Sequence, residues 1–140
     1  VDLTRMASLG EPDPQVRRLF DAVTQAQAAA FATIREGISA SDVDAAARGT
    51  LEGFGLAEAF GHGTGHGLGI EVHEEPRIGR RRPQGQPDAI DSVLEAGMTF
   101  TVEPGVYLPG TGGIRLEDDV LVTREGYELL TDAPRGLAVR

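Results

Sequence analysis

The spacing of apolar residues divides the chain into a helical part and a part rich in strands. Between residues 14 and 35, apolar side chains recur at the three- and four-residue intervals of an amphipathic helix. Asp13 is placed to cap this helix, with Pro14 at its first position and Gly37 beyond its end. A second helix is predicted from Ser39, with Asp42 completing a capping box, to the glycines at 53 and 55.

From residue 61 the amino-acid composition shifts to glycine, proline and β-branched residues, which predicts short strands. They are expected over residues 1–9, 68–73, 92–94, 99–103, 105–108, 114–123 and 127–130. Residues 79–91 are predicted to form a loop whose arginines lie in solvent, the alternative being a substrate or subunit contact. Two helices followed by a run of strands indicate an α+β fold. We expect a curved, mainly antiparallel sheet with the helices on its outer face.

Composition narrows the class of protein. A length of 140 residues suits one domain, and 40% hydrophobic residues are enough for a core. A net charge of −9 argues against nucleic acid as a partner. The chain has no cysteine, which excludes disulfides and thiolate chemistry, and it has no apolar run long enough to span a membrane. We therefore expect no membrane partner and a cytoplasmic location.

The chain begins at Val1, inside a segment that looks like the middle of a strand. Because translation starts at methionine, we expect residues 1–140 to be part of a longer domain whose first portion is missing. The alternative is a trimmed but complete small domain.

The candidate chemistry lies in three segments. All three histidines, His62, His66 and His73, fall in a glycine-rich run, and Glu103 and Glu117 interrupt two apolar strand segments. Strand alternation places each carboxylate on the face opposite its apolar neighbours. A buried carboxylate requires a cationic partner, which can be a divalent metal or an arginine. The alternative for each residue alone is a solvated strand face and a surface histidine.

Residues 66–73, 101–107 and 113–119 together resemble the signature of the pita-bread (M24) metallopeptidases, in the branch of aminopeptidase P and prolidase. Residues 1–5 resemble the family strand that carries an aspartate ligand before a Thr-Arg pair. The resemblance implies the pita-bread fold and nearly covers the chain, as the C-terminal part of that catalytic domain.

The resemblance also implies roles for individual residues. The implied metal ligands are Asp2, His66, Glu103 and Glu117, and the implied catalytic residues are His62, His73, Glu103 and Arg115. The implied cofactors are two divalent metal ions, with manganese favoured and cobalt or zinc as alternatives. A fifth family ligand would precede Asp2, so we expect residues 1–140 alone to bind one ion at best and to be poorly active.

The implied reaction is hydrolysis of Xaa-Pro bonds, at the N-terminus of peptides or in dipeptides, by a hydroxide that bridges the two metals. The expected partners are a peptide with proline in second position and a second copy in a homodimer. Methionine aminopeptidase is an alternative within the peptidases. A non-catalytic or creatinase-like protein of the same fold is an alternative outside them.

Overall fold

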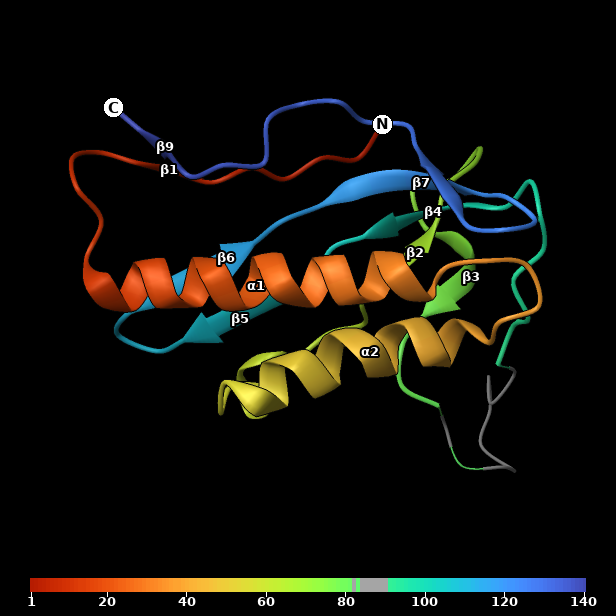
Figure 1. The fold of residues 1–140 in the computed structure, drawn as a ribbon, viewed down its shortest axis with the longest axis horizontal. Coiled ribbons are helices and arrows are strands. Elements are labelled where there is room, and N and C mark those ends of the chain that lie inside the picture. Colours follow the sequence, from red (N-terminus) through yellow and green to blue (C-terminus); the bar gives the residue numbers. More distant parts are fainter. Residues whose placement is uncertain (82, 84–90) are drawn as a thin grey trace.

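The computed structural model describes residues 1–81, 83 and 91–140, and Figure 1 shows their arrangement. The predicted helices form as α1 (Pro14–Thr33) and α2 (Ala40–Gly53), followed by the short 3₁₀ turn η1 (Ala57–Ala59). The strands are β1 (Ala7–Ser8), β2 (Gly65–Gly67), β3 (Glu74–Ile78), β4 (Thr99–Val102), β5 (Gly105–Leu108), β6 (Gly112–Arg115), β7 (Asp118–Val122), β8 (Tyr127–Leu129) and β9 (Ala138–Val139).

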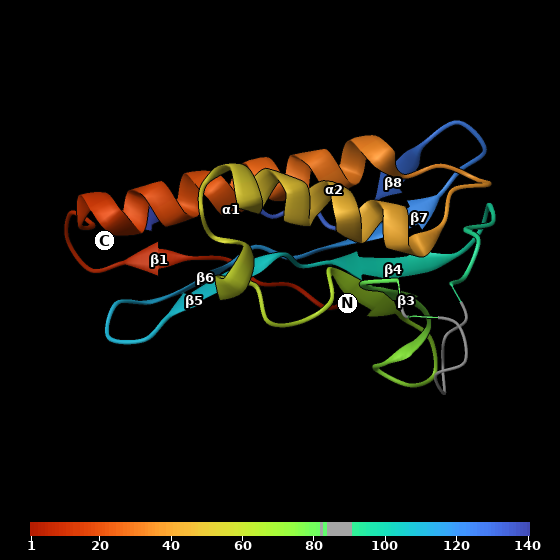
Figure 2. The ribbon, with the colours of Figure 1, turned by 90° about the horizontal axis from the view of Figure 1, so that it is seen from below.

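The main sheet has the strand order β3-β2-β4-β7-β8, and all of its neighbouring strands run antiparallel. Strands β5 and β6 form a separate antiparallel pair, whereas β1 and β9 pair in parallel. Both helices lie on the same side of these strands (Figure 2). The expected α+β architecture, with a mainly antiparallel sheet and helices on one face, is therefore confirmed.

The core lies between the helices and the main sheet. Leu19, Val23 and Leu51 on the helices are buried, as are Phe100 and Val102 on β4. The alternation predicted for β4 thus places its apolar face on the helices. Burial of one such side chain stabilises the fold by about 1.5–3 kcal/mol, so this face fixes the orientation of β4.

The predicted capping box at the second helix is wrong, because the Ser39 side chain forms no capping hydrogen bond. Asp91 caps the helix instead: its Oδ1 accepts the Ser41 N–H at 3.0 Å and its Oδ2 accepts the Ser41 hydroxyl at 2.6 Å. Burial favours the neutral acid, but hydrogen bonds from Ser41 and Arg81 outweigh it and lower the pKa of Asp91. Ser39 forms an isolated β-bridge with Val93. The strand predicted over residues 92–94 is therefore reduced to this single bridge.

The strand predicted over residues 68–73 is also wrong. This segment is the turn between β2 and β3, which pair Gly65 with Ile78 and Gly67 with Glu74. The apolar residues that suggested the strand, Ile70 and Val72, are 103% and 64% exposed. The alternation of apolar and polar residues in this segment therefore does not correspond to a buried strand face.

The long strand predicted over residues 114–123 is divided in the structure, whereas the strands predicted over 99–103 and 105–108 form separately as β4 and β5. The segment 114–123 forms β6 and β7, which belong to different sheets, and the break falls at Leu116 and Glu117. Strands β4 and β5 are separated at Glu103 and Pro104. Both candidate carboxylates thus lie where the chain passes from one sheet to the other, so they are freed from regular ladder pairing.

The helix ends and termini also differ from expectation. Helix α1 ends at Thr33, since Ile34 is extended. The strand predicted over 1–9 is reduced to β1 and a bridge between Thr4 and Glu117, and β9 was not predicted. Of the predicted loop 79–91, residues 82 and 84–90 lie outside the described residues. No helix in the described part of the chain is long and apolar enough to span a membrane.

Candidate metal centre

The N-terminal segment brings Asp2 to the strand junction that carries Glu117. Thr4 forms an antiparallel bridge with Glu117, in which the Glu117 N–H donates to the Thr4 carbonyl at 3.2 Å. Arg5 strengthens this attachment, because its Nη1 donates to the Glu117 carbonyl at 2.7 Å and its Nη2 to Asp118 Oδ1 at 2.6 Å. The contact joins residues more than 110 positions apart in the chain.

His66 is placed by the close approach of β2 to β4. Its backbone N–H donates to the Thr101 hydroxyl at 3.1 Å. Gly65 permits this approach, because a Cβ built there would lie 1.8 Å from the Thr101 carbonyl oxygen. The His66 Nδ1 lies 3.1 Å from the Gly67 carbonyl. A proton on Nδ1 would satisfy that carbonyl and leave the Nε2 lone pair available to a metal.

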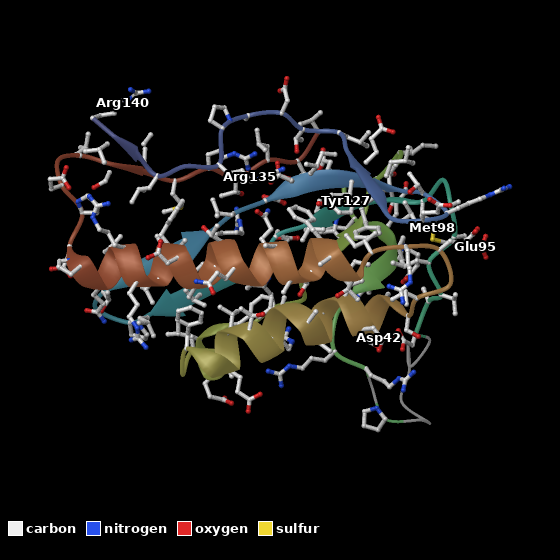
Figure 3. The ribbon with its side chains drawn as sticks, viewed as in Figure 1. Asp42, Glu95, Met98, Tyr127, Arg135 and Arg140 are labelled. Atoms are coloured by element: carbon white, nitrogen blue, oxygen red, sulfur yellow. The ribbon has the colours of Figure 1, made fainter. Side chains whose placement is uncertain are left out.

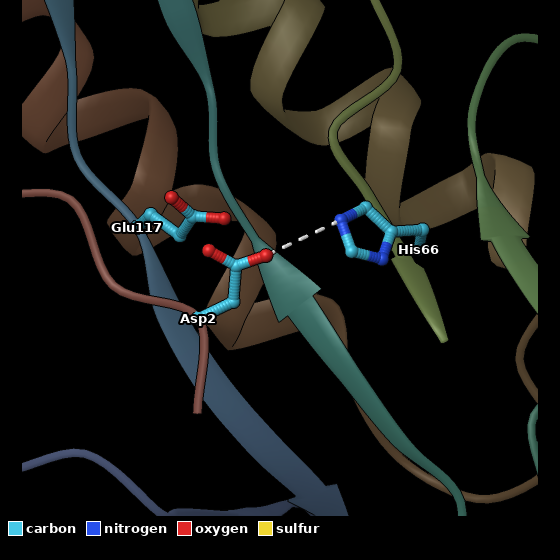
Figure 4. A group of neighbouring side chains, drawn as sticks. All are labelled: Asp2, His66 and Glu117. Atoms are coloured by element: carbon cyan, nitrogen blue, oxygen red, sulfur yellow. Dashed lines mark ion pairs between the residues drawn. The ribbon is translucent and has the colours of Figure 1, made fainter. Parts of the chain in front are cut away.

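Four of the predicted site residues, His66 among them, come together in the structure. In the described part of the chain, Asp2, His66 and Glu117 form a set whose potential ligand atoms all lie within 4.8 Å of one another (Figure 4). His66 Nε2 is 3.8 Å from Asp2 Oδ2. The fourth residue, Glu103, approaches the same nitrogen, with Oε1 3.3 Å away. The Thr101 hydroxyl donates to this Glu103 oxygen at 3.2 Å.

The carboxylates of this cluster repel one another. Burial raises the pKa of Glu117, and the nearby charges of Glu103 and Asp2 raise it further. The Thr4 hydroxyl, which donates to Glu117 Oε2, and the charge of Arg115 oppose this rise without cancelling it. Arg115 Nε is 3.7 Å from Glu117 Oε2 and donates to the Thr4 hydroxyl at 3.0 Å. A further cation would therefore stabilise the ionised cluster.

A second layer of charge lies behind Glu117. The buried Asp118 carboxylate accepts hydrogen bonds from Arg5, Arg135 and Thr131, at 2.6, 2.7 and 2.6 Å. Burial opposes ionisation of Asp118, but these partners outweigh it and lower its pKa. Arg135 extends from the C-terminal segment toward α1 (Figure 3). This network is fully paired, in contrast to the ligand cluster.

The next residue, Asp119, faces the cluster. Its Oδ2 accepts the Asp2 N–H at 3.0 Å, whereas its Oδ1 is buried and has no hydrogen-bond partner within the described residues. Burial raises the pKa of Asp119, and the charges of Asp2 and Asp118 add to that rise. Asp119 therefore holds the backbone of Asp2 through this hydrogen bond.

The remaining predicted residues form the wall of the site. The imidazole rings of His73 and His66 are tilted against each other, with centroids 4.1 Å apart. His62 Nε2 lies 3.0 Å from the Tyr107 hydroxyl. A hollow of about 280 Å³ lies between them, and a cleft of about 1050 Å³ opens beside it. The smaller hollow is lined by His62, His66, His73, Glu103, Arg115 and two glycines.

The donor set fits a divalent metal. Three carboxylates and one imidazole converge with excess negative charge, and a hard or borderline cation such as manganese, cobalt or zinc suits oxygen-rich ligation with one nitrogen. Asp2, His66, Glu103 and Glu117 are the residues that would hold it. The donor set is that expected of a metal-dependent protein with oxygen-rich ligation.

Sequence reasoning missed several residues that support the ligands. Thr4 and Thr101 hold Glu117 and Glu103 through their hydroxyls, and Tyr107 contacts His62. Thr101 lies two positions before Glu103, so strand alternation places both side chains on one face, which is the signal that the sequence offers. Thr4 and Tyr107 lie within the motifs, but nothing in the sequence indicated their contacts, because their partners are distant in the chain.

Comparison with known proteins agrees with this class. The chain belongs to metallopeptidase family M24, whose family model matches residues 1–124. It is 47% identical over 138 residues to "Probable dipeptidase PepE" of Mycobacterium tuberculosis, covering 99% of this chain and 35% of that protein. It is 40% identical over 138 residues to "Uncharacterized peptidase YqhT" of Bacillus subtilis, covering 99% of this chain and 37% of that one.

Solved structures with the pita-bread fold are similarly close. The X-Pro aminopeptidase from Thermotoga maritima superposes with a TM-score of 0.91 at 41% identity, covering all of this chain and 38% of the other. The Xaa-Pro dipeptidase from Bacillus anthracis superposes with a TM-score of 0.92 at 41% identity, covering 100% and 37%. The chain thus spans little more than a third of the length of these proteins.

Proposed function

We propose that this chain carries the metal site of a peptidase that hydrolyses Xaa-Pro bonds. The observation that supports this proposal most is the convergence of Asp2, Glu103 and Glu117 on His66, from four separate segments of a metallopeptidase fold. The names of the similar solved structures, an X-Pro aminopeptidase and an Xaa-Pro dipeptidase, support the choice of bond.

When bound, divalent ions supply Lewis-acid chemistry, polarising a carbonyl and making water more acidic. Glu103 is proposed to take the proton from the attacking water and to pass it to the leaving amine. Its carboxylate lies beside His66 Nε2 and is oriented by the Thr101 hydroxyl, so both its position and its direction are fixed.

The side chains at the wall of the site are proposed to hold the substrate. His73, whose ring is tilted against that of His66 at the turn between β2 and β3, would donate a hydrogen bond to the scissile carbonyl as negative charge develops there. His62 would line the pocket for the proline side. Arg115 would keep Glu117 and the N-terminal segment in register through its contact with Thr4.

The test is to assay the natural protein with Mn²⁺ on three probes: an Xaa-Pro dipeptide, an Xaa-Pro-Xaa tripeptide and a methionyl peptide without proline. Cleavage of the first two, or of one of them, at the Xaa-Pro bond is expected, and the relative rates assign dipeptidase or aminopeptidase action. Cleavage of only the methionyl peptide would instead assign a methionine aminopeptidase. No cleavage of any probe would contradict the proposal.

The variant His66→Ala tests the site itself. We expect loss of Mn²⁺ binding and of activity, because the only nitrogen donor of the cluster is removed. Asp42→Asn is the matched control, since Asp42 is an exposed acid on α2 (Figure 3). Retained metal and retained activity in His66→Ala would overturn the assignment.

For residues 1–140 alone, we propose binding of at most one Mn²⁺. Asp2, His66, Glu103 and Glu117 provide donors for a single position. Calorimetric titration with Mn²⁺ checks this, and two tight, equivalent sites would contradict it. We also propose that the protein is cytoplasmic and that it forms a homodimer.

A further inference from the structure

An ion pair on α2, formed by residues that are not metal ligands, is connected to the candidate site by a continuous set of hydrogen bonds. Asp44 and Arg48 lie one helical turn apart, with Arg48 Nε 2.6 Å from Asp44 Oδ2 and Nη2 3.2 Å from Oδ1. Asp44 is 1% exposed. A buried ion pair contributes little net stability, because desolvation offsets the attraction between the charges. The pair also makes hydrogen bonds to the loop formed by residues 60–64.

Arg48 holds the backbone of the loop formed by residues 60–64, which carries His62. Its Nη1 donates to the Phe60 carbonyl at 3.0 Å, and its Nη2 donates to the His62 carbonyl. The guanidinium group also lies over the Phe60 ring, 4.2 Å from its centroid. The same ring meets the His62 imidazole edge-on at 5.0 Å. Arg48 thus fixes both the backbone of His62 and the aromatic surface against which its imidazole rests.

Asp44 holds the other end of the same loop. Its Oδ1 accepts the backbone N–H of Thr64 at 3.0 Å and the Thr64 hydroxyl at 2.8 Å, and Thr64 is fully buried. The Thr64 carbonyl in turn accepts the N–H of Glu103 at 2.7 Å. One carboxylate on α2 is therefore two hydrogen bonds away from the backbone of a proposed metal ligand.

We propose that Asp44 and Arg48 are positioning residues for the peptidase site: Arg48 holds residues 60–62 and so fixes the His62 imidazole, whereas Asp44 holds Thr64 and so fixes the Glu103 backbone. This inference rests on the proposed function. The flanking glycines at 61 and 63 give the loop little conformational restriction of its own, so the restraint comes from α2. A lysine cannot replace Arg48, because its single ammonium group lacks the planar fork that reaches Asp44 and two carbonyls together.

The kinetic test is a double-mutant cycle in the natural protein with Mn²⁺ and an Xaa-Pro peptide. We expect Arg48→Lys to lower kcat/KM by about 10- to 100-fold, mainly through KM, with unchanged Mn²⁺ affinity. In a His62→Ala background the same change should alter kcat/KM less than about twofold, because its effect acts through His62. Multiplicative effects of the two changes would overturn the proposal.

A spectroscopic test does not depend on activity. The imidazole C–H signal of His62, identified by its loss in His62→Ala, should shift in Arg48→Lys. It should stay in place in the control Arg18→Lys, which alters an exposed helix arginine that also donates to a carbonyl, that of Phe54. An unmoved His62 signal in Arg48→Lys would refute the positioning role.

The two tests also separate this inference from the proposed function. If the wild-type protein cleaves no Xaa-Pro peptide, the proposed function fails, whereas the His62 signal still decides the role of Arg48. If Arg48→Lys does not fold, Thr64→Val takes its place, because it removes one hydrogen bond to Asp44 and leaves the ion pair. An unshifted Glu103 amide signal in folded Thr64→Val would then refute the connection.

Discussion

Replacement of Gly65 by alanine should disrupt the metal centre, although Gly65 itself provides no ligand. Gly65 lies on β2 next to His66, where β2 crosses close to the backbone of β4. A Cβ at this position would lie 1.8 Å from the Thr101 carbonyl oxygen and 2.7 Å from the carbonyl carbon. Real Cβ contacts are essentially never shorter than 3.0 Å. The two strands must therefore separate.

The size of the effect follows from this distance. Relief of the clash requires the Cβ–oxygen separation to rise from 1.8 Å to at least 3.0 Å, and the obstacle is backbone that cannot rotate away. Crowding of this kind costs about 1–3 kcal/mol of stability. The shift also separates His66 on β2 from the Thr101 hydroxyl, which holds both the His66 N–H and the Glu103 carboxylate. Loss of such support lowers metal affinity by about 10- to 100-fold.

Calorimetric titration with Mn²⁺ and urea unfolding measure the two effects in Gly65→Ala. Gly61→Ala is the matched control, because a Cβ there meets no atom within 4 Å. Glycine-to-alanine exchange in the control should leave Mn²⁺ affinity unchanged. If Gly65→Ala bound Mn²⁺ as tightly as the wild type and were equally stable, the close approach of β2 to β4 would not be what orients the ligands.

Three further outcomes can be measured. Asp91→Ala should destabilise the chain by about 1 kcal/mol in urea unfolding by removing the cap of α2, while Ser39→Ala should not. Folding lowers the pKa of Asp91, so the stability that its ionised carboxylate contributes is complete above the ordinary pKa of about 4 and is lost as the pH falls through the lowered pKa. A stability difference between the wild type and Asp91→Ala that grew toward acid pH would contradict this. Phe100→Ala should cost about 3–5 kcal/mol in the same assay, and a cost below 1 kcal/mol would refute the assigned core. Tyr107→Phe should weaken the peptidase kcat/KM through the lost contact with His62 and leave Mn²⁺ affinity unchanged; a loss of metal would contradict its place at the wall.

The helices and the apolar face of β4 could be predicted because their signals are local. The apolar period of α1 and the alternation around Phe100 each reflect one element against one core. The turn at 68–73 could not, since the exposed Ile70 and Val72 mimic the alternation of a half-buried strand. The cap of α2 was assigned to Ser39 by its spacing, whereas the structure supplies Asp91 from a segment about 50 residues away.

The sequence by itself determined the helices, the α+β class and, through its motifs, the residues that carry the proposed chemistry. Only the tertiary structure decided how they meet. Asp2 reaches Glu117 because Thr4 and Arg5 pair with a strand junction over 110 residues away. His66 reaches Glu103 because Gly65 lets two strands approach. Local sequence patterns report burial and backbone preference, but distances between such segments depend on strand pairing and on buried polar contacts. These contacts also assign Asp44 and Arg48 a place near the site that no motif indicated.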